Sequence, residues 1–408
     1  MQYREDTKSG NRLSVLGFGC MRFGRTLSGA IDLKKAESLI VRAVEGGVNY
    51  FDTAYMYPGS EEALGAVLEK NGLREKVYVA TKLPIAFCRG HEDFDKFFTQ
   101  ELKRLRTSYV DYYLLHMLTD LHYWETLKSW GIETWMEEKK KAGLVRSMGF
   151  SFHGIQGEFL KLLDAYPWDF CQIQYNYSDE NFQAGAGGLK KAAEKMPVII
   201  MEPLLGGRLA RPPRAAAELF KKANPARSPA AWALNWIWDQ KEAAVALSGM
   251  NEASQLEENL TLADAALPGM ITGEEREVYR RVKALFNASY KIPCTGCNYC
   301  MPCPQNVNIP GSFGAYNTSF LINWFWGMQQ YATSTTLTSE KLSSPRLCVK
   351  CGKCESRCPQ HLPVIQYLGK VRRRMEPLPV RLIVAAARAV LRRNRKGIRV
   401  EGERKGEG

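Results

Sequence analysis

Short apolar runs alternate with longer stretches in which apolar residues recur every three or four positions throughout residues 1–290. The short runs are rich in β-branched and aromatic residues, as buried strands are, and the longer stretches have the spacing of amphipathic helices. The predicted strands are Ser14–Gly19, Val48–Thr53, Val77–Thr81, Asp111–Leu115, Val145–Ser151, Phe170–Gln174, Pro197–Met201 and Ala244–Ser248. The predicted helices between them include Leu33–Glu45, Glu61–Lys70, Phe94–Leu105, Thr126–Ala142 and Ala230–Gln240.

Eight strands that alternate with helices over this length predict an α/β fold, a (β/α)8 TIM barrel. A doubly wound parallel sheet is the alternative, but no G-x-G-x-x-G sequence opens a helix after a predicted strand. In a barrel of this kind the active site lies at the carboxyl ends of the strands. Polar residues that directly follow a strand are therefore the candidates for chemistry.

The pattern changes near Ile292-Pro293, where closely spaced cysteines begin. The expected division is a barrel over residues 1–290, a small ferredoxin-like domain over 291–370 and a tail over 371–408. The stretches Ile309–Tyr316 and Phe320–Tyr331 have helical spacing, so we expect the small domain to be mainly α-helical. Its aromatic residues are expected to be core residues that pack the domain on the barrel. They are Trp324, Phe325, Trp326 and Tyr331.

Eight of the eleven cysteines form two runs in this domain, and each run ends in a Cys-Pro pair. The first run is Cys294, Cys297, Cys300 and Cys303, and the second is Cys348, Cys351, Cys354 and Cys358. Thiolates at this spacing hold [4Fe–4S] clusters, and the fourth cysteine of each run ligates the other cluster. The prediction is two clusters, one bound by Cys294, Cys297, Cys300 and Cys358, the other by Cys303, Cys348, Cys351 and Cys354.

Structural zinc and disulfides are the alternatives to iron–sulfur clusters. Zinc sites use two separated cysteine pairs more often than four evenly spaced thiolates. Disulfides require export, and the N-terminus lacks the apolar segment of a signal peptide. One departure from the cluster pattern is that two residues, not three, precede the fourth cysteine of the first run.

The amino-acid composition indicates where in the cell the protein is expected to lie. Hydrophobic residues make up 45% of the chain, as in ordinary globular proteins, and no apolar run approaches the ~20 residues that span a bilayer. Reduced cysteines and the lack of a signal peptide predict a cytoplasmic protein. Clusters near the surface would favour an oxygen-poor cell.

The net charge of +13 is concentrated in the tail, because 13 Lys/Arg and 4 Asp/Glu lie between Lys370 and the end. No nucleic-acid recognition motif accompanies this charge, so no nucleic acid partner is expected. A basic amphipathic helix is predicted over Val380–Arg395. Such a helix can lie on an acidic membrane surface, which would make the protein peripheral to the membrane, or bind an acidic partner. A solvated helix followed by a disordered end is the alternative.

Four polar residues stand at or just after the predicted strands two, three and four: Asp52, Tyr57, Lys82 and His116. A tyrosine hydroxyl can protonate a carbonyl oxygen as hydride reaches the carbon, but its pKa near 10 is high for that task. An adjacent ammonium group lowers this pKa, and a buried carboxylate holds the ammonium in place. We therefore expect Tyr57 to be the acid, Lys82 to tune it, Asp52 to hold Lys82 and His116 to orient the substrate oxygen.

These residues and their surroundings resemble the aldo/keto reductase family over about the first 265 residues, and the cysteine runs resemble its ferredoxin-fused branch. The matching segments are Leu16–Arg22, Phe51–Tyr57, Thr81-Lys82, Leu114–His116 and Gly143–Ser151. The resemblance implies an NAD(P)H cofactor bound across the barrel mouth and a small carbonyl-type substrate. It places Ser151 and Gln172 at the carboxamide, Ser248 and Gly249 near the phosphates, and Glu258 and Asn259 at the adenine.

Several positions depart from the family pattern. Phe152 follows Ser151 where Asn is usual, and Met201 stands where an aromatic ring usually stacks on the nicotinamide. Gly249 and Gln255 replace the basic residues that commonly bind a 2′-phosphate. Because a missing cation removes a charge-assisted bond, the resemblance does not extend to a preference for NADP. Arg208 is an alternative phosphate contact or an ordinary surface residue.

The two predicted modules differ in the number of electrons that they move. A barrel of this type transfers two electrons as hydride and each cluster transfers one, so a flavin would ordinarily bridge them. No sequence feature that binds a flavin is present. Three functions remain open: an iron–sulfur oxidoreductase coupled to a ferredoxin or other redox partner, a carbonyl reductase with structural or docking clusters, and an electron-transfer subunit with an inactive barrel.

Overall fold

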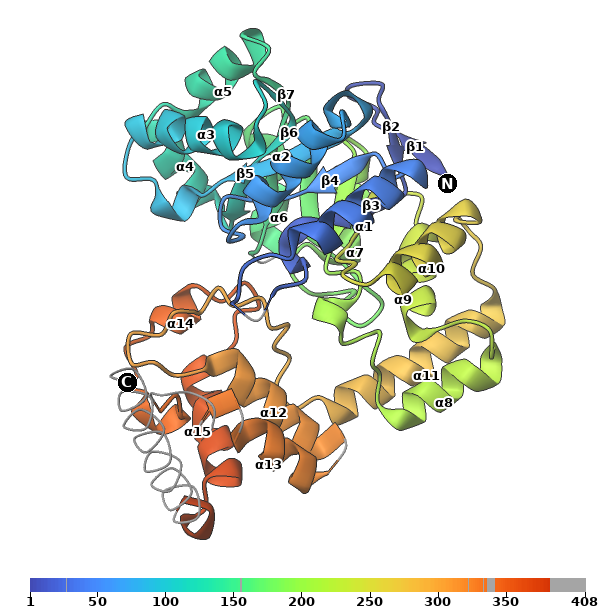
Figure 1. Ribbon diagram of the computed structural model, residues 1–408, viewed down its shortest axis with the longest axis vertical. Coiled ribbons are helices and arrows are strands. Elements are labelled where there is room, and N and C mark those ends of the chain that lie inside the picture. The colour runs from blue at the N-terminus through green and yellow to red at the C-terminus, as the bar shows by residue number, and fades with distance from the viewer. Residues whose placement is uncertain (27, 155, 322, 333, 336–341, 382–408) are drawn as a thin grey trace, which may run out of the picture. The chain divides into compact units, whose positions relative to one another are not determined.

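The computed structural model describes residues 1–381 except residues 27, 155, 322, 333 and 336–341. The described chain forms two compact units (Figure 1). The first contains Met1–Arg211 and Glu218–Arg280, and the second contains Pro212–Ala217 and the chain from Arg281 onward. Two helices, α8 (Arg214–Ala223) and α11 (Gly273–Ser289), contribute residues to both units.

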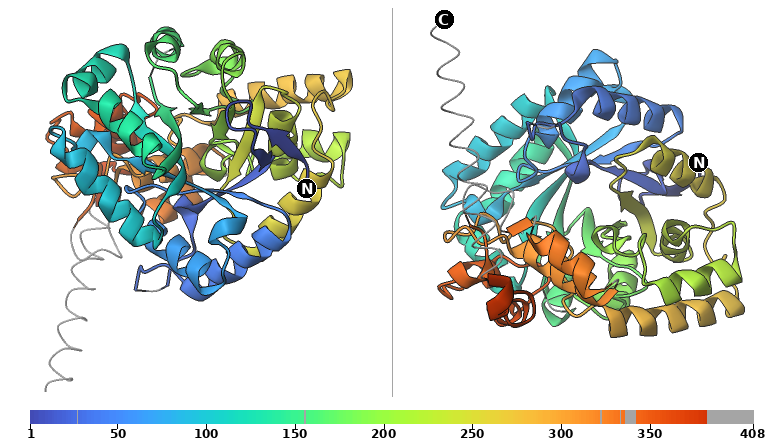
Figure 2. Two further views of the ribbon diagram at one scale, coloured as in Figure 1. Left: turned by 90° about the horizontal axis from the view of Figure 1, so that it is seen from above. Right: turned by 60° about the horizontal axis from the view of Figure 1, so that its bottom comes forward.

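A closed barrel of eight parallel strands forms the centre of the first unit, with helices around it (Figure 2). The strands pair in the order β10-β3-β4-β5-β6-β7-β8-β9. Their bounds are β3 Leu16–Gly19, β4 Tyr50–Asp52, β5 Tyr78–Leu83, β6 Val110–Leu118, β7 Val145–Phe152, β8 Phe170–Gln174, β9 Val198–Met201 and β10 Ala243–Ser248. All eight predicted strands and the TIM-barrel fold are thereby confirmed.

The helices of this unit follow the predicted pattern with one exception. They are α1 Leu33–Glu45, α2 Ser60–Lys70, α3 Glu92–Leu105, α4 Leu121–Ser129, α5 Ile132–Lys141, α6 Gln156–Ala165, α7 Gly185–Ala193, α9 Pro229–Trp238 and α10 Ala253–Asp264, with α8 and α11 given above. The prediction of one helix over Thr126–Ala142 is wrong. The chain breaks between α4 and α5 at Gly131, whose φ of 82° suits a residue without a Cβ and is incompatible with a continuous helix.

A short antiparallel hairpin was not predicted. It consists of β1 (Tyr3–Glu5) and β2 (Arg12–Ser14), with Tyr3 opposite Ser14. Since β2 leads directly into the start of β3, the hairpin lies at the amino end of the barrel, away from the strand ends that carry the candidate chemistry. Three-residue strands are too short to give a readable alternation of apolar and polar positions.

Large side chains fill the interior of the barrel. Tyr50, Tyr112 and Phe170 are fully buried, and their rings pack edge to face or tilted at centroid distances of 5.0–5.2 Å. The residues of this cluster come from both neighbouring and opposite strands, so the barrel is a packed core and not a pore. This core fixes the strand ends that hold the candidate site.

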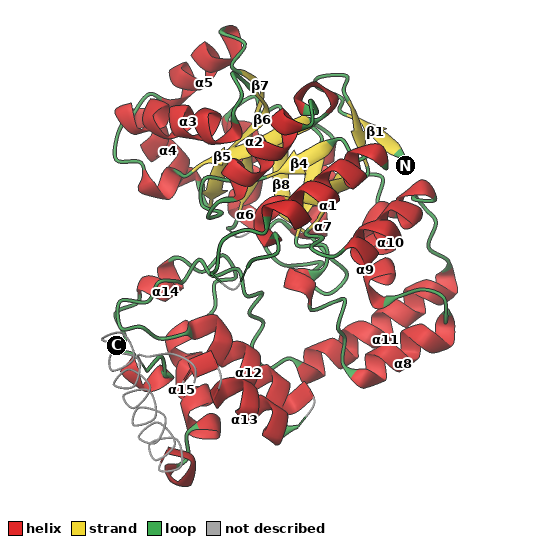
Figure 3. Cartoon of the chain, in the orientation of Figure 1, coloured by secondary structure: helices red, strands yellow, loops and turns green. Residues whose placement is uncertain are grey.

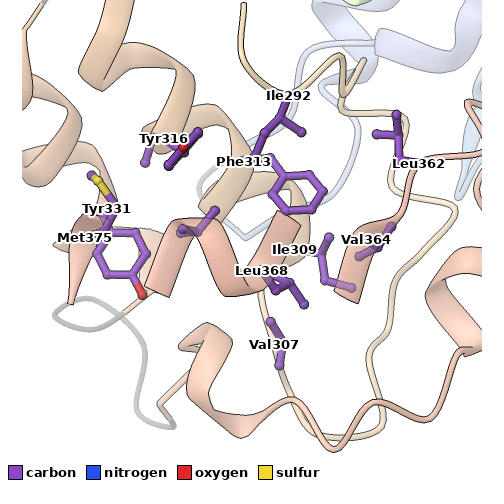
Figure 4. Packing of buried hydrophobic residues seen from close by; sticks show 12 residues of the cluster. Ile292, Val307, Ile309, Phe313, Tyr316, Tyr331, Leu362, Val364, Leu368 and Met375 are labelled. Atoms are coloured by element: carbon purple, nitrogen blue, oxygen red, sulfur yellow. The ribbon is translucent and has the colours of Figure 1, made fainter. Parts of the chain in front are cut away.

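The described residues of the second unit form helices and loops and no strand (Figure 3). Its helices are α12 Ile309–Leu321, α13 Trp324–Ala332, α14 Lys353–Ser356 and α15 Val364–Met375. Their shared core contains Phe313, Tyr331 and Leu368 (Figure 4). The mainly α-helical character expected of this domain is confirmed. Six cysteines of the two runs pack against this core: Cys294, Cys300, Cys303, Cys348, Cys354 and Cys358.

The aromatic residues of α13 do not all belong to the core. Tyr331 is 2% exposed, but Trp324, Phe325 and Trp326 are 41%, 68% and 51% exposed. Consecutive helical residues point about 100° apart, so three in a row cannot face one core. The expectation of a core role is therefore right for Tyr331 and wrong for the other three, and their packing on the barrel stays a prediction.

The tail can be described only in part. Residues 382–408 lie outside the described structure, and with them nearly all of the helix predicted over Val380–Arg395. Among the described helices, none combines the length and apolar character needed to cross a membrane.

Candidate active site and cysteine cavities

The four strand-end residues lie close together at the carboxyl ends of three neighbouring strands. Asp52 ends β4, Lys82 lies near the end of β5, His116 lies in β6, and Tyr57 follows β4 in a half-buried loop. Lys82 Nζ donates hydrogen bonds to both carboxylate oxygens of Asp52 and to the Thr53 carbonyl, each at 2.7 Å. The same Nζ lies 5.1 Å from the centre of the Tyr57 ring. The ammonium is thus held by a carboxylate and adjoins a phenol.

Burial dominates the electrostatics of the ion pair. Lys82 is 0% exposed and Asp52 is 3% exposed. Burial raises the pKa of Asp52, and the charge and hydrogen bonds of Lys82 oppose that rise. Removal of one member of a buried ion pair destabilises the folded protein by about 3–5 kcal/mol, because the other charge then remains uncompensated. The two side chains therefore hold each other in place.

His116 is the second ring beside Tyr57. The rings meet edge to face with their centres 6.0 Å apart. Burial, followed by the charges of Lys82 and His153, lowers the pKa of His116 well below its usual value. The imidazole is consequently neutral at physiological pH, and one of its nitrogens carries a proton that can be donated.

A layer of polar contacts supports the site from behind, and sequence reasoning missed it. Thr81 donates to the buried Glu61 at 2.6 Å, and Arg104 pairs with Glu61 at 3.1 Å. Because Thr81 directly precedes Lys82, these contacts fix the end of β5 that presents the ammonium. The available signal was the acidic start of α2, Ser60-Glu61-Glu62, directly after the tyrosine loop.

Two residues predicted at a nicotinamide are paired in the sheet. Ser151 of β7 lies opposite Gln172 of β8. The Ser151 hydroxyl accepts a hydrogen bond from the Met117 amide at 2.8 Å. Gln172 is 1% exposed, and within the described chain its amide oxygen Oε1 has no hydrogen-bond partner. A buried carbonyl oxygen without a donor is a suitable partner for the N–H group of a carboxamide.

The residues predicted at the phosphates and adenine lie around the start of α10. Asn259 donates to the Ser248 hydroxyl at 3.1 Å, and both side chains are buried. Glu258 instead lines an open groove between α9, α10 and the segment 224–227. The Asn259 side chain is thus already hydrogen-bonded to Ser248, whereas Glu258 lies in a groove.

One cation, Arg22, lies near Gly249 although the expected basic residues are absent. A Cβ built on Gly249 would lie 3.4 Å from the Arg22 side chain. The pKa of the buried Glu202 is raised by burial, and Arg22 and Arg208 counter this rise. Arg22 was missed as a candidate, and the signal for it was a basic residue just after the first barrel strand.

The eight cysteines of the second unit line two cavities. One cavity is lined by Cys294, Cys297, Cys300 and Cys358. The other is lined by Cys303, Cys348, Cys351 and Cys354, and Cys300 lines both cavities. Each cavity thus contains three cysteines of one run and the last cysteine of the other, which is the grouping that crossed ligation requires.

The backbone of the two runs repeats residue by residue. Left-handed φ values occur at Gly296 (70°) and Asn298 (68°) in the first run, and at Lys350 (59°) and Gly352 (77°) at the matching positions of the second. Turns of this type point successive N–H groups toward one side, a geometry common at iron–sulfur sites. The Lys350 amide lies 3.4 Å from the Cys348 sulfur, within hydrogen-bonding distance.

The charges of the thiols also fit a positively charged group. Burial raises the pKa of Cys300, and the neighbouring thiols of Cys294, Cys297 and Cys358 raise it further. Four thiolates that repel each other in one cavity are stabilised by bound iron, which offsets their charge. The cavities therefore fit two four-thiolate clusters by grouping, backbone and charge.

Comparison with known proteins agrees with both modules. Residues 15–274 match the model of the Aldo/keto reductase family, and residues 293–362 match that of the 4Fe-4S dicluster domain. An aldo-keto reductase of Mycobacterium sp. (strain MCS) is 33% identical over 141 residues, which are 34% of this chain and 45% of that protein. The chain thus spans about half the length of this curated relative.

Two solved structures share the barrel. The holo form of aldo-keto reductase AKR11C1 from Bacillus halodurans has a TM-score of 0.57 at 25% identity, over 69% of this chain and 96% of that chain. An aldo-keto reductase from Klebsiella pneumoniae in complex with NADPH has the same TM-score at 22% identity, over the same shares of the two chains. Since the family match covers most of this chain, the chain belongs to the aldo/keto reductase family and carries a 4Fe-4S dicluster domain after the barrel.

Proposed function

We propose that this protein is an iron–sulfur oxidoreductase that reduces a carbonyl or related group in its barrel, with electrons exchanged through two [4Fe–4S] clusters. The observation that supports the barrel chemistry is the buried Lys82–Asp52 pair beside Tyr57. A buried ammonium next to a phenol has little use in a structural barrel but suits an acid that must release its proton near neutral pH.

Each of the four residues has a role in this proposal. Tyr57 donates its hydroxyl proton to the carbonyl oxygen. Lys82 stabilises the resulting phenolate by its positive charge, while Asp52 and the Thr53 carbonyl fix the ammonium. His116 donates a hydrogen bond that orients the substrate oxygen.

The neutral state of His116 leads to a test by pH. A lowered pKa means that the imidazole stays unprotonated as the pH falls through 6.5. We expect kcat for reduction of an aromatic aldehyde such as 4-nitrobenzaldehyde to stay flat between about pH 5.5 and 7.5. A decline with a midpoint near 6.5 that is absent in His116→Gln would show that His116 titrates in this range and contradict the assignment.

We propose that the barrel also binds NAD(P)H, since Gln172 presents a buried, unpartnered amide oxygen beside Ser151. When bound, the nicotinamide supplies hydride. Glu258 lies in a groove that can receive the adenine end. Arg22 and Arg208, which gather around Glu202, are the candidates for the phosphates. None of these contacts selects between NADH and NADPH.

The C-terminal unit supplies the second half of the proposal. Its two cavities hold the clusters through the crossed sets of cysteines, and the clusters, when bound, supply single electrons. A ferredoxin or another one-electron protein is the proposed partner. Thiolate ligands need a reducing compartment, so we propose that the protein works in the cytoplasm. Contact of residues 371–408 with an acidic partner or membrane surface is the proposed role of the tail.

The test is anaerobic purification with iron and sulfide analysis, followed by spectroscopy with NADH or NADPH and then with an aldehyde. We expect about eight irons per chain, cluster absorption that NAD(P)H bleaches, and recovery on adding the aldehyde. Aldehyde turnover with no bleaching would favour a carbonyl reductase with structural clusters. Clusters that a ferredoxin reduces, with no turnover from any donor, would favour an electron-transfer subunit. Zinc in place of iron would overturn the proposal.

A further inference from the structure

The two cysteine loops share a backbone but differ in charge. Residues 294–308 contain no charged side chain. In the second run, Lys350, Lys353 and Arg357 alternate with Cys351 and Cys354. All three basic side chains are exposed, and within the described chain none of them forms an ion pair. The second loop therefore carries a basic rim that the first loop lacks.

The one acid of the second loop does not cancel this charge. Glu355 is only half-buried, but its carboxylate accepts a hydrogen bond from the Ile365 amide at 2.9 Å. It is thereby engaged with α15 inside the unit.

The loops also differ in exposure at matching positions. Val349 of the second loop is 62% exposed, whereas Thr295 at the same place in the first loop is 5% exposed. Cys351 is the one exposed cysteine among the eight, and the others are half-buried. Hence the loop at the cavity lined by Cys303, Cys348, Cys351 and Cys354 exposes a cysteine and an apolar side chain that the first loop does not expose.

From this asymmetry we infer that the second loop is the docking surface for a small acidic protein that carries one electron. The inference rests on the proposed function. Carboxylates of the carrier face Lys350, Lys353 and Arg357 around the exposed Val349. Electron tunnelling weakens steeply with distance, so the carrier must approach the edge where a cluster lies nearest the surface. Charge complementarity then fixes orientation and raises the association rate, as is usual for weak redox contacts.

The redox step balances with one electron. The reduced carrier loses one electron and is oxidised, and the cluster held by Cys303, Cys348, Cys351 and Cys354 gains that electron and is reduced. No proton and no bond change is involved. The side chains of the rim position the carrier and take no part in the chemistry.

The experiment uses the full-length protein loaded with iron and a small acidic two-[4Fe–4S] ferredoxin as the probe. Binding of the two oxidised proteins is measured by calorimetry at low and at physiological ionic strength. We expect Lys350→Glu/Lys353→Glu/Arg357→Glu to weaken binding, so that the dissociation constant at low ionic strength rises by at least about tenfold. Reduction by dithionite, which needs no docking, should reach the same cluster signal in the variant as in the wild type.

The matched control is Lys8→Glu/Lys76→Glu/Lys241→Glu, which makes the same charge change at three exposed positions of the barrel unit. It should bind the ferredoxin nearly as the wild type does. The inference is overturned by a wild type that does not bind, by a rim variant that binds normally, or by an equal loss in the control. Binding between oxidised proteins does not involve barrel turnover, so failure here is distinguishable from failure of the proposed function.

Discussion

Replacement of Tyr57 by Phe should lower kcat for aldehyde reduction by about 10²–10⁴-fold, the usual contribution of a positioned general acid. The substitution removes one oxygen atom and leaves the ring between Lys82 and His116. Folding should therefore be unchanged, and binding of the nucleotide should persist. Steady-state kinetics with 4-nitrobenzaldehyde measures kcat of the variant and the wild type, and circular dichroism shows whether the variant is folded.

Tyr55→Phe is the matched control, because Tyr55 lies two residues away in the same loop. Its hydroxyl donates to Gln100 at 3.1 Å, away from Lys82 and His116. Loss of that bond should cost about 0.5–1.5 kcal/mol of stability and leave kcat nearly unchanged. Near-normal turnover in Tyr57→Phe, or an equal loss in both variants, would remove Tyr57 from the role of the acid.

Two double cysteine variants should lose different amounts of iron, depending on whether the two cysteines line the same cavity. Because Cys303 and Cys351 line one cavity, Cys303→Ala/Cys351→Ala should lose one cluster and retain about four irons. Cys297 and Cys303 line different cavities, so Cys297→Ala/Cys303→Ala should lose nearly all iron. Iron analysis and electron paramagnetic resonance after reduction measure both results.

The reverse outcome has an equally definite meaning. If each run bound its own cluster, Cys297 and Cys303 would share one cluster and their double variant would be the one that keeps about four irons. Cys171→Ala serves as the control, because Cys171 is buried in β8 of the barrel and should not affect iron content. Full iron in all three variants would contradict the assignment of these cysteines as ligands.

The barrel and the candidate residues could be predicted from sequence because both depend on local patterns. Each buried strand gives its own apolar run, and closure of eight such units places the strand ends at one mouth. Asp52 and Lys82 could therefore be expected near each other, and the structure has them in contact at 2.7 Å. The cysteine spacing likewise determines which thiols can share a cavity.

Other features depend on contacts that no local pattern encodes. The break between α4 and α5 is set by one glycine within an otherwise helical stretch. The support of Thr81 by Glu61 and Arg104 joins residues that are 20 and 43 positions apart. The exposure of Trp324 and Trp326 depends on which side of α13 faces the core of the unit, and aromatic content alone suggested the opposite.

The exposed indole rings of Trp324 and Trp326 allow the C-terminal unit to be followed by tryptophan fluorescence. All nine tryptophans lie in the described chain, and only Trp324 and Trp326 belong to the C-terminal unit. Six of the seven in the barrel unit are buried, and Trp130 is half-buried. A collisional quencher such as iodide will therefore act mainly on the C-terminal unit. A decrease in iodide quenching when a ligand or partner is added would show that α13 becomes covered.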